Sequence, residues 1–243
     1  MTAVVAVGNG KGGVGKTTLG VGVGAELALR GHRVTIIDCD HKGDQPGHAS
    51  AFGAKGKVPG LAVIGEYERV IDGRPHREPI GEGNLLDVLK AERSKADLII
   101  LDLPGLTSRL TMMGMQSSHF VVIPLKLSLP DLRDALRTET QVVQAAELLM
   151  RPIHYGFLWS QVPQRFESAT ERAVREKLEN REGGAPVFKP ALMTSDAFAE
   201  MLVTGEPPQL KTDKRSRNAA ANLAALADAL LQQLAEAAER RVA

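Results

Sequence analysis

Gly10-Lys11-Gly12-Gly13-Val14-Gly15-Lys16-Thr17 is the stretch that decides the fold of this 243-residue chain. It matches the pattern G-x-x-x-x-G-K-[ST] of a phosphate-binding loop, or P-loop. Apolar residues 3–7 precede it and a helix-compatible segment, 16–30, follows it, which is the context that the motif requires. Its glycines allow backbone N–H groups to converge on phosphate oxygens, and the following helix adds the positive end of its dipole. A plain glycine-rich turn is the alternative, and the complete motif in this context favours the phosphate site.

Two side chains of this loop have specific expected roles. Lys16 is expected to reach the β- and γ-phosphates of a nucleotide, and the Thr17 hydroxyl is expected to ligate Mg²⁺. The other residues would contribute mainly backbone N–H groups. The predicted nucleotide contacts in the loop are Gly10, Lys11, Gly12, Gly13, Val14, Gly15, Lys16, Thr17 and Thr18.

Lys11 is not required by an ordinary phosphate-binding loop, because Lys16 already serves the phosphates. With this second lysine, residues 11–18 resemble the deviant Walker A motif of the ParA/MinD superfamily. In that superfamily the extra lysine reaches across a dimer interface to the partner's nucleotide. The resemblance implies catalytic roles for Lys11 and Lys16 and a homodimer that forms with ATP, since a cation facing a second triphosphate needs two subunits. The alternative is a solvated surface lysine.

A second run, residues 34–40, has the pattern of a buried strand and ends in Asp38-Cys39-Asp40. It resembles the D-x-D signature that closes the second strand in the same superfamily. The resemblance implies that Asp40 positions the attacking water and that Asp38 supports Mg²⁺ or its water shell. The usual Pro-Gln after the second aspartate is replaced here by His41-Lys42. This departure leaves the switch geometry and the hydrolysis rate open.

A third run, residues 97–105, has the pattern of a Walker B strand, with four apolar residues that suit burial on both faces of a parallel sheet. Asp102 at its carboxyl end is expected to hold the Mg²⁺ water shell, and Gly105 to let backbone approach the γ-phosphate. The resemblance places the adenine contacts near Gln161 and Pro190. The N-K-x-D motif of GTPases does not occur in the sequence, which favours ATP.

Composition agrees with a cytoplasmic globular ATPase. Hydrophobic residues make up 43% of the chain and the formal net charge is +1, which is typical of neither a disordered chain nor one saturated with nucleic acid. The single cysteine, Cys39, excludes an intramolecular disulfide and a cysteine-built metal site, and we interpret it as a core residue. We identify no signal peptide and no apolar run long enough to span a bilayer, so stable membrane insertion is not expected.

Apolar patterns of strand and helix type alternate along the chain, which predicts an α/β fold with a doubly wound, mostly parallel sheet and helices on both faces. Its ligand crevice would lie at the carboxyl ends of the strands. We expect one domain over residues 1–243, with a C-terminal helix at about 215–240 packed on it and surface loops at 42–60 and 72–83. Candidate strands are 3–8, 33–38, 60–65, 97–103, 119–124, 153–160 and 186–192, and candidate helices are 16–30, 84–95, 107–116, 130–150, 167–181, 195–204 and 215–240.

The densest basic run lies at residues 211–217, where four cations accompany one acid. ParA-like ATPases bind DNA without sequence preference, and the resemblance implies the same electrostatic, salt-sensitive binding here. A solvated charged face is the alternative reading of such a run. The predicted DNA contacts are Lys211, Lys214, Arg215 and Arg217.

These observations favour a weak, ATP-switched, dimerising ATPase that binds double-stranded DNA at the nucleoid and positions or segregates plasmid DNA or another cargo. The resemblance also implies an adaptor protein that stimulates hydrolysis. One alternative is a membrane-associated positioning ATPase like MinD. Another is a factor in conjugative DNA transfer, because segments 161–163, 171–180 and 195–201 are similar to the VirC branch. An electron- or metal-carrying relative would need interface cysteines, which a lone Cys39 does not supply.

Overall fold

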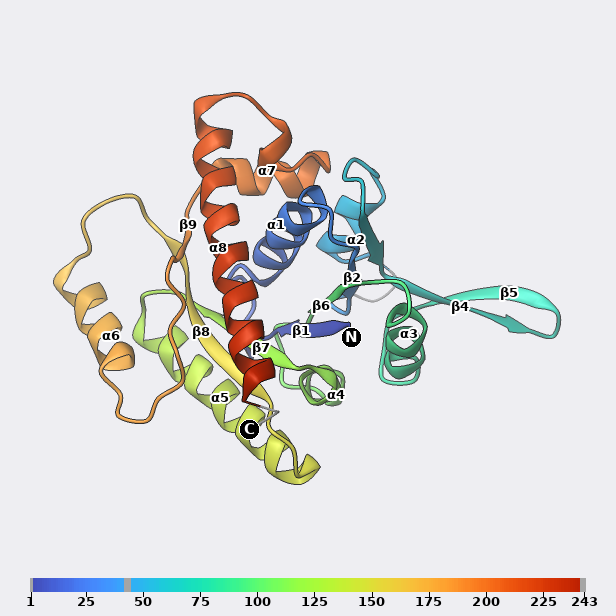
Figure 1. The fold of residues 1–243 in the computed structure, drawn as a ribbon, viewed down its shortest axis with the longest axis horizontal. Helices are drawn as coiled ribbons and strands as arrows, with labels where there is room; N and C mark the ends of the chain where they lie inside the picture. Colours follow the sequence, from blue (N-terminus) through green and yellow to red (C-terminus); the bar gives the residue numbers. More distant parts are fainter. Residues whose placement is uncertain (1, 42–44, 241–243) are drawn as a thin grey trace.

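A seven-stranded parallel sheet forms the centre of the computed structural model, which describes residues 2–41 and 45–240 (Figure 1). Its strands in chain order are β1 (Ala3–Val7), β2 (Val34–Asp38), β3 (Leu61–Ile64), β6 (Leu98–Asp102), β7 (Phe120–Leu125), β8 (His154–Val162) and β9 (Leu192–Met193). The strand order across the sheet is β3-β2-β6-β1-β7-β8-β9, and every neighbouring pair is parallel. The predicted doubly wound, parallel α/β fold is therefore confirmed.

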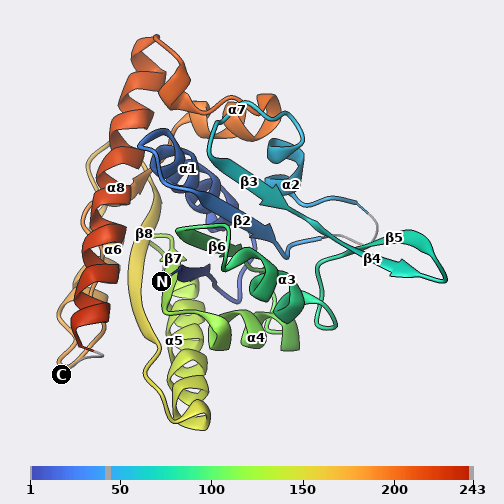
Figure 2. The ribbon, with the colours of Figure 1, turned by 45° about the vertical axis from the view of Figure 1, so that its right-hand side comes forward.

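Helices cover both faces of the sheet because the strands are apolar on both sides (Figures 1 and 2). Alternate strand residues enter opposite core layers, so Val5 packs on one side and Val4 on the other. The first layer contains side chains of α1 (Lys16–Leu29), α2 (His48–Gly53), α7 (Asp196–Thr204) and α8 (Lys214–Glu239). The second contains side chains of α3 (Leu85–Glu92), α4 (Arg109–Ser117), α5 (Leu129–Leu149) and α6 (Ala169–Glu179). A short 3₁₀ turn, η1 (Pro208–Leu210), precedes α8.

Helix α8 packs along α1 through an apolar stripe, as expected for a C-terminal helix packed on the domain. Leu223, Leu226 and Leu230 are all buried. The approach is close at Gly22, where a Cβ would lie 2.5 Å from Leu223 Cδ2, so that glycine leaves room for the leucine. Among the described helices, none combines the length and apolar character needed to cross a membrane.

The structure corrects two expected loops and one expected strand. Residues 48–53, within the expected loop 42–60, form α2, which buries Ala49 and Phe52; three residues of that loop, 42–44, lie outside the described part of the chain. The strand expected at 186–192 is reduced to β9 and an isolated bridge between Phe157 and Val187. Prolines at positions 186 and 190 lack the N–H group that a continuous ladder needs.

A β-hairpin occupies most of the other expected loop, 72–83. Strands β4 (Glu66–Ile71) and β5 (Arg74–Pro79) pair antiparallel and project from the body (Figures 1 and 2). Asp72 and Gly73 connect them with φ values of 50° and 75°, the positive pair that Asp-Gly favours in a two-residue hairpin turn. Polar side chains on both faces concealed the alternation that marks a half-buried strand.

Candidate functional site

A cavity of 830 Å³ opens at the carboxyl ends of the parallel strands. This is the edge where an open α/β sheet holds its ligand, and the volume suits a nucleotide-sized molecule. The structure brings most of the predicted nucleotide contacts together here. Those that line the cavity are Gly12, Gly13, Gly15, Lys16, Thr17, Thr18, Asp40, Gly105 and Gln161.

The loop between β1 and α1 has the shape of an anion cradle. Gly13 and Gly15 adopt φ values of 71° and 85°, a conformation that turns successive backbone N–H groups inward. Strand β8 supports the loop from the side. The Ser160 hydroxyl donates to the Val14 carbonyl at 2.7 Å, and the Gln161 amide donates to the Gly13 carbonyl at 3.1 Å.

Asn9 holds the start of the loop from below. It is fully buried, its side-chain amide donates to the Pro124 carbonyl at 2.7 Å, and its side-chain oxygen accepts the Lys11 N–H at 3.0 Å. The only signal for Asn9 in the sequence is its place directly before the motif. A buried amide with both ends bonded fixes the loop relative to the sheet.

Lys16 lies in the cradle and is 5% exposed. Its Nζ donates to the Lys11 carbonyl at 3.0 Å, so the side chain curls inside the loop. Burial lowers the pKa of Lys16, and the negative charges of Asp102 and Asp40 oppose that shift. An ammonium group held in this way is placed to meet an anion in the cavity.

Asp102 lies beneath the cavity at the end of β6 and is 1% exposed. Within the described residues neither carboxylate oxygen has a hydrogen-bond partner of good geometry, although the Thr17 hydroxyl lies close enough to lower the carboxyl's pKa. Burial, with repulsion from Asp38 and Asp40, outweighs that effect and raises the pKa of Asp102 to about 7. A buried, unpartnered carboxylate beside a threonine hydroxyl fits a divalent cation and its water shell.

Asp38 at the end of β2 is buried too, but its oxygens are occupied. The Ser50 N–H and hydroxyl donate to Oδ2 at 2.7 and 2.6 Å, and the Asp40 N–H donates to Oδ1 at 3.1 Å. A Cβ at Gly47 would lie 2.4 Å from both carboxylate oxygens, so the glycine allows the start of α2 to approach Asp38. Asp38 therefore anchors α2 to the sheet in this structure.

The segment after Asp40 forms another wall of the cavity. His41 and His48 line it together with Asp40, and sequence reasoning gave neither histidine a contact there. Lys42, which completes the departure from the superfamily's usual sequence, lies outside the described residues.

Lys11 does not point into the cavity in this structure. Its Nζ lies 3.0 Å from Oδ2 of Asp131, near the start of α5. The same helix contacts the loop again, because the Gly10 N–H donates to the Thr138 hydroxyl at 3.3 Å. No local pattern in the sequence predicts these contacts, which join residues 120 and 128 positions apart.

Gly105 and Pro190 differ in where the structure places them. A Cβ at Gly105 would lie 2.7 Å from the Gly12 nitrogen, so only glycine allows the two backbones to approach so closely. Pro190 is not among the described residues that line the cavity. Its predicted adenine contact therefore stays a prediction.

The predicted DNA-binding cations lie around the start of α8 and differ in their environment. Lys211 and Arg215 both form ion pairs with Glu200, the second at 2.7 Å. Lys214 and Arg217 are exposed and form no ion pair with any described residue. Two of the four predicted cations therefore share one carboxylate within the chain, which neutralises one of their two charges.

Cys39 has the core role that the sequence indicates. It is 3% exposed, and burial, with repulsion from nearby carboxylates, raises the pKa of its thiol well above the ordinary value. A thiol that stays protonated is a poor nucleophile and a poor metal ligand.

Comparisons with known proteins agree with this geometry. Residues 5–208 match the model of the CobQ/CobB/MinD/ParA nucleotide binding domain. The protein ParA of Rhizobium radiobacter is 25% identical over 237 residues, which span 96% of this chain and 98% of that protein.

Two solved structures share the fold. A McdA variant of Cyanothece in complex with ATP has a TM-score of 0.68 at 15% identity, over 94% of this chain and 96% of that one. The septum site-determining protein MinD of Pyrococcus horikoshii, complexed with Mg-ADP, has a TM-score of 0.63 at 17% identity, over 95% of this chain and 98% of that one.

Proposed function

The chain belongs to the CobQ/CobB/MinD/ParA nucleotide-binding family, and from that premise we propose that it is an ATP-dependent switch that positions or segregates DNA or another cargo. In this proposal ATP and Mg²⁺ bind, two copies associate, the dimer binds DNA, and hydrolysis releases it. Residues 1–243 act as one ATPase domain. The observation that carries the proposal is one cavity in which Lys16 and Asp40 meet the glycine cradle, above a buried Asp102.

The P-loop holds the triphosphate in this proposal. Backbone N–H groups of residues 10–18 surround the phosphates, and Lys16 exchanges its bond to the Lys11 carbonyl for phosphate oxygens. Gly105 keeps the loop after β6 close to this cradle. Gln161, already bonded to the loop, and Pro190 contact the base. The ATP and Mg-ADP complexes of structurally similar proteins support this choice of ligand.

Thr17 and Asp102 would hold Mg²⁺, and Asp38 would support its water shell. The Asp102 carboxyl group would then lose its proton and face a cation. The cation would offset the free-energy cost of burying an ionised carboxylate that has no hydrogen-bond partner. Asp38 would keep the Ser50 hydroxyl as a partner in this role. When bound, the cation would neutralise negative charge that develops on the phosphates during hydrolysis.

Asp40 positions the attacking water. It lines the cavity just after the end of β2, and its backbone N–H donates to Asp38, which supports this role. A carboxylate that orients water and accepts its proton is the usual device for such a displacement. We expect slow intrinsic hydrolysis that an adaptor protein accelerates, because the segment after Asp40 departs from the superfamily's sequence.

Lys11 acts on the partner subunit's nucleotide and thereby couples ATP to dimerisation. In the structure it is bound to Asp131, and its side chain is 38% exposed, so it can turn outward without rearranging the core. Two cationic lysines facing two triphosphates would favour the dimer only when ATP is bound.

DNA binds to the dimer through the start of α8. Lys214 and Arg217 are the exposed, unpaired cations among the described residues of this surface, and dimerisation doubles their number. Lys211 and Arg215 would contribute after exchanging Glu200 for phosphate. Sequence-independent binding of this kind fits a protein that works at the nucleoid.

Membrane positioning of the MinD type and DNA transfer of the VirC type remain alternatives for the cargo. The apolar stripe of α8 is buried against α1, which disfavours its use as a membrane anchor. Sedimentation with liposomes in the presence of ATP separates the membrane alternative from DNA binding.

Phosphate release from ATP and Mg²⁺ tests the proposal. The wild type should hydrolyse ATP slowly, Lys16→Ala should lose ATP binding, and Asp40→Ala should bind ATP but hydrolyse it at least about tenfold more slowly. Lys90→Ala, at an exposed position of α3, is the control. Unchanged ATP affinity in Lys16→Ala would contradict the phosphate site, and unchanged hydrolysis in Asp40→Ala would contradict the role of that carboxylate.

A further inference from the structure

Phe166, in the loop between β8 and α6, is 98% exposed, whereas the other five phenylalanines are at most 6% exposed. A single exposed apolar side chain is common on protein surfaces and carries no inference by itself. The surroundings of Phe166 do carry one, because they fix the loop and place cations beside it.

The backbone of this loop is fixed by a network centred on Arg165. Its guanidinium donates to both carboxylate oxygens of Glu171, at 2.9 and 2.8 Å, and to the Phe166 carbonyl at 2.8 Å. Glu171 also accepts the Ser168 N–H at 2.8 Å, within the capping box that begins α6. The Phe166 backbone is therefore held in place while its side chain stays in solvent, so a ligand could bind the ring without first ordering the loop.

A cavity of 360 Å³, which we call the α8 pocket, lies beside this loop. It is lined by Gln164, Ser195, Lys214, Arg215 and Asn218. This lining holds two cations, three neutral polar side chains and no acid. Gln164 precedes Phe166 by two residues, which span at most about 7 Å of extended chain, so the ring and the pocket lie close together.

The charges around the α8 pocket leave it cationic. Segments 195–200 and 211–217 together carry four cations and three acids. Glu200 is bound to Lys211 and Arg215, and the Asp213 carboxylate accepts the Ser216 N–H at 3.0 Å. Lys214 is exposed and forms no ion pair with any described residue, so its ammonium group is available to an anion.

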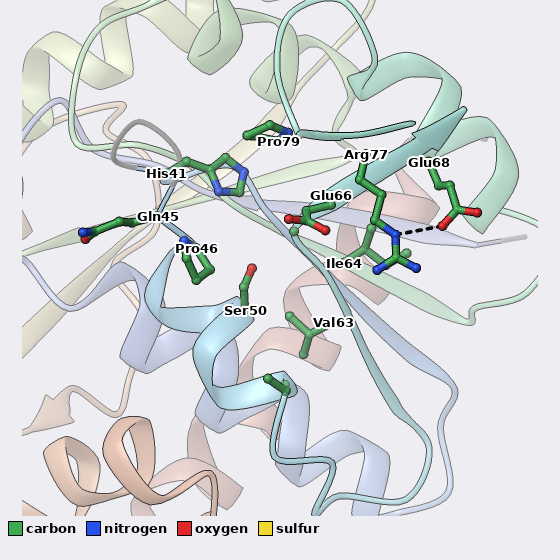
Figure 3. Close-up of a pocket in the computed structure, with 13 residues that line it drawn as sticks. His41, Gln45, Pro46, Ser50, Val63, Ile64, Glu66, Glu68, Arg77 and Pro79 are labelled. Atoms are coloured by element: carbon green, nitrogen blue, oxygen red, sulfur yellow. Dashed lines mark hydrogen bonds and ion pairs between the residues drawn. The ribbon is translucent and has the colours of Figure 1, made fainter. Parts of the chain in front are cut away.

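The cavity of 480 Å³ at the base of the β4–β5 hairpin has the opposite character (Figure 3). Apart from His41, its titratable side chains are Glu66, Glu68 and Arg77, and the last two are paired at 2.9 Å. A polyanion would therefore meet an uncompensated acid in that cavity and cations at the α8 pocket.

Cations with an exposed aromatic ring beside them fit single-stranded nucleic acid. Lysine and arginine contact its phosphates, and its unpaired bases expose flat faces that stack on aromatic rings. In a duplex these faces are covered by the neighbouring base pairs, so the ring would need an opened base step. An acidic peptide would meet the same cations but offers no series of flat faces to the ring.

We propose that the α8 pocket and Phe166 form a binding site for single-stranded nucleic acid, with a phosphate at Lys214 and Arg215 and a base stacked on the Phe166 ring. The amide and hydroxyl groups of the other lining residues donate to phosphate, sugar or base edges. The site shares the α8 cations with the proposed binding of duplex DNA and rests on that function for them alone. It requires neither ATP hydrolysis nor the dimer.

Fluorescence anisotropy of labelled oligonucleotides tests the binding. The probes are an oligothymidylate of about twelve nucleotides, an oligouridylate of the same length and a duplex of the same number of base pairs. Each is titrated with the full chain, without nucleotide and with Mg²⁺ and a non-hydrolysable ATP analogue. We expect saturable binding of a single strand in both conditions, and the tighter of the two single strands identifies DNA or RNA as the ligand.

Replacing Phe166 separates stacking from electrostatics. Phe166→Ala should raise the Kd for the single strand about tenfold and change the Kd for the duplex by less than about twofold. Phe166→Leu keeps an apolar side chain without an aromatic face, so it should bind the single strand as weakly as Phe166→Ala. Leu148→Ala, at a position of α5 that is 76% exposed, is the control and should bind like the wild type.

Salt dependence identifies the residue that meets a phosphate. Log affinity for a single strand falls against log salt with a slope of about −0.7 per phosphate contact. Lys214→Ala should make this slope shallower by about 0.7 and should weaken duplex binding too. Phe166→Ala should leave the slope unchanged, because stacking releases no counterions.

Phe166→Trp reports stacking directly. Trp159 is 1% exposed, so the fluorescence of the wild type should change little when the oligothymidylate binds. In Phe166→Trp the exposed indole should be quenched by the stacked base, and the quenching should saturate at the same concentrations as the anisotropy. Anisotropy that saturates without quenching would contradict the stacking.

A single-strand Kd that Phe166→Ala leaves unchanged would overturn the proposal. Wild-type affinity in Phe166→Leu would show an apolar contact in place of stacking, and an equal loss of single-strand and duplex affinity in Phe166→Ala would remove the single-strand preference. Displacement of the oligothymidylate by polyglutamate at equal charge would assign the surface to an acidic protein segment.

The two probes also separate this proposal from the proposed function. If the wild type binds the duplex and Phe166→Ala changes neither affinity, the single-strand site fails and duplex binding stands. If the wild type binds a single strand through Phe166 but does not bind the duplex, the proposed duplex binding fails and the single-strand site stands.

Discussion

Lys11 Nζ lies 3.0 Å from Asp131 Oδ2, so the second lysine of the phosphate-binding loop is bound within its own chain. The Asp131 side chain is 5% exposed and also interacts with the Ser128 hydroxyl, whereas the Lys11 side chain is 38% exposed. The Lys11 side chain can therefore turn away from this ion pair, whereas the buried Asp131 side chain cannot. If Lys11 acts on a partner subunit, breaking this ion pair is part of the cost of forming the dimer.

Replacing Asp131 by asparagine should favour the ATP-bound dimer. The variant keeps the size of the side chain and removes the charge that holds Lys11, so the dimer should form at a severalfold lower protein concentration. Light scattering with a non-hydrolysable ATP analogue measures this. Asp134→Asn, on the same helix but paired with Arg137, should behave like the wild type. Weaker dimerisation of Asp131→Asn would mean that the aspartate supports Lys11 in the dimer.

Asp102 should make the nucleotide-free protein less stable as the pH rises. The folded carboxyl keeps its proton up to a pKa of about 7, whereas the unfolded chain releases it near 3.8, so the folded state binds one more proton between these values. Stability is thus lost as the pH rises through this window, by about 4 kcal/mol in total and about 3 kcal/mol between pH 5 and 8.

Urea unfolding of the wild type and Asp102→Asn at these two pH values checks this effect. The variant should lose less stability than the wild type, because asparagine does not titrate. Equal losses would contradict the raised pKa of Asp102, because the folded and unfolded states would then bind the same number of protons between pH 5 and 8.

Ser50→Ala should destabilise the fold at the end of β2. The change removes the 2.6 Å hydrogen bond from the hydroxyl to the buried Asp38 carboxylate, and we expect a loss of about 1–3 kcal/mol in the free energy of unfolding. Ser94→Ala, whose exposed hydroxyl donates at 3.2 Å to a carbonyl, should cost far less. A loss for Ser50→Ala as small as that for Ser94→Ala would mean that water replaces the hydroxyl.

The phosphate-binding loop and the acids Asp40 and Asp102 could be predicted from the sequence because each lies next to a strong local pattern. Runs of four or five apolar residues marked the central strands, and the motif placed the cavity at their carboxyl ends. The partners of the loop could not be predicted. Asp131 and Ser160 reach it from 120 and 146 positions away, and only the packing of the sheet brings them together.

The hairpin and α2 were missed for a different reason. Both β4 and β5 carry charged side chains on both faces, so neither shows the alternation of a half-buried strand, although Asp72-Gly73 is a hairpin signal. Helix α2 has six residues, fewer than a periodic pattern needs to be recognised.

DNA binding should depend more on Arg217 than on Arg215. Arg217→Glu should weaken binding to every duplex about equally, whereas Arg215→Glu should have a smaller effect because Glu200 already pairs with that arginine. If the Lys214 and Arg217 side chains of a dimer meet four phosphates, log affinity should fall against log salt with a slope of about −4. Nitrocellulose filter binding with ATP at several salt concentrations measures both. Equal effects of the two changes on DNA affinity would contradict the pairing of Arg215 with Glu200. Unchanged DNA affinity in both variants would mean that DNA binds to another face of the protein.

If ATP joins two copies of the chain through Lys11, the molecular mass of Lys11→Ala in the presence of nucleotide should be that of a monomer. Multi-angle light scattering is performed with Mg²⁺ and a non-hydrolysable ATP analogue, and nucleotide binding is measured in parallel. We expect twice the chain's 26.0 kDa for the wild type and 26.0 kDa for the variant, with analogue affinity retained within a few fold. A variant that still forms the dimer would contradict the claim and reduce Lys11 to an ordinary residue of the loop.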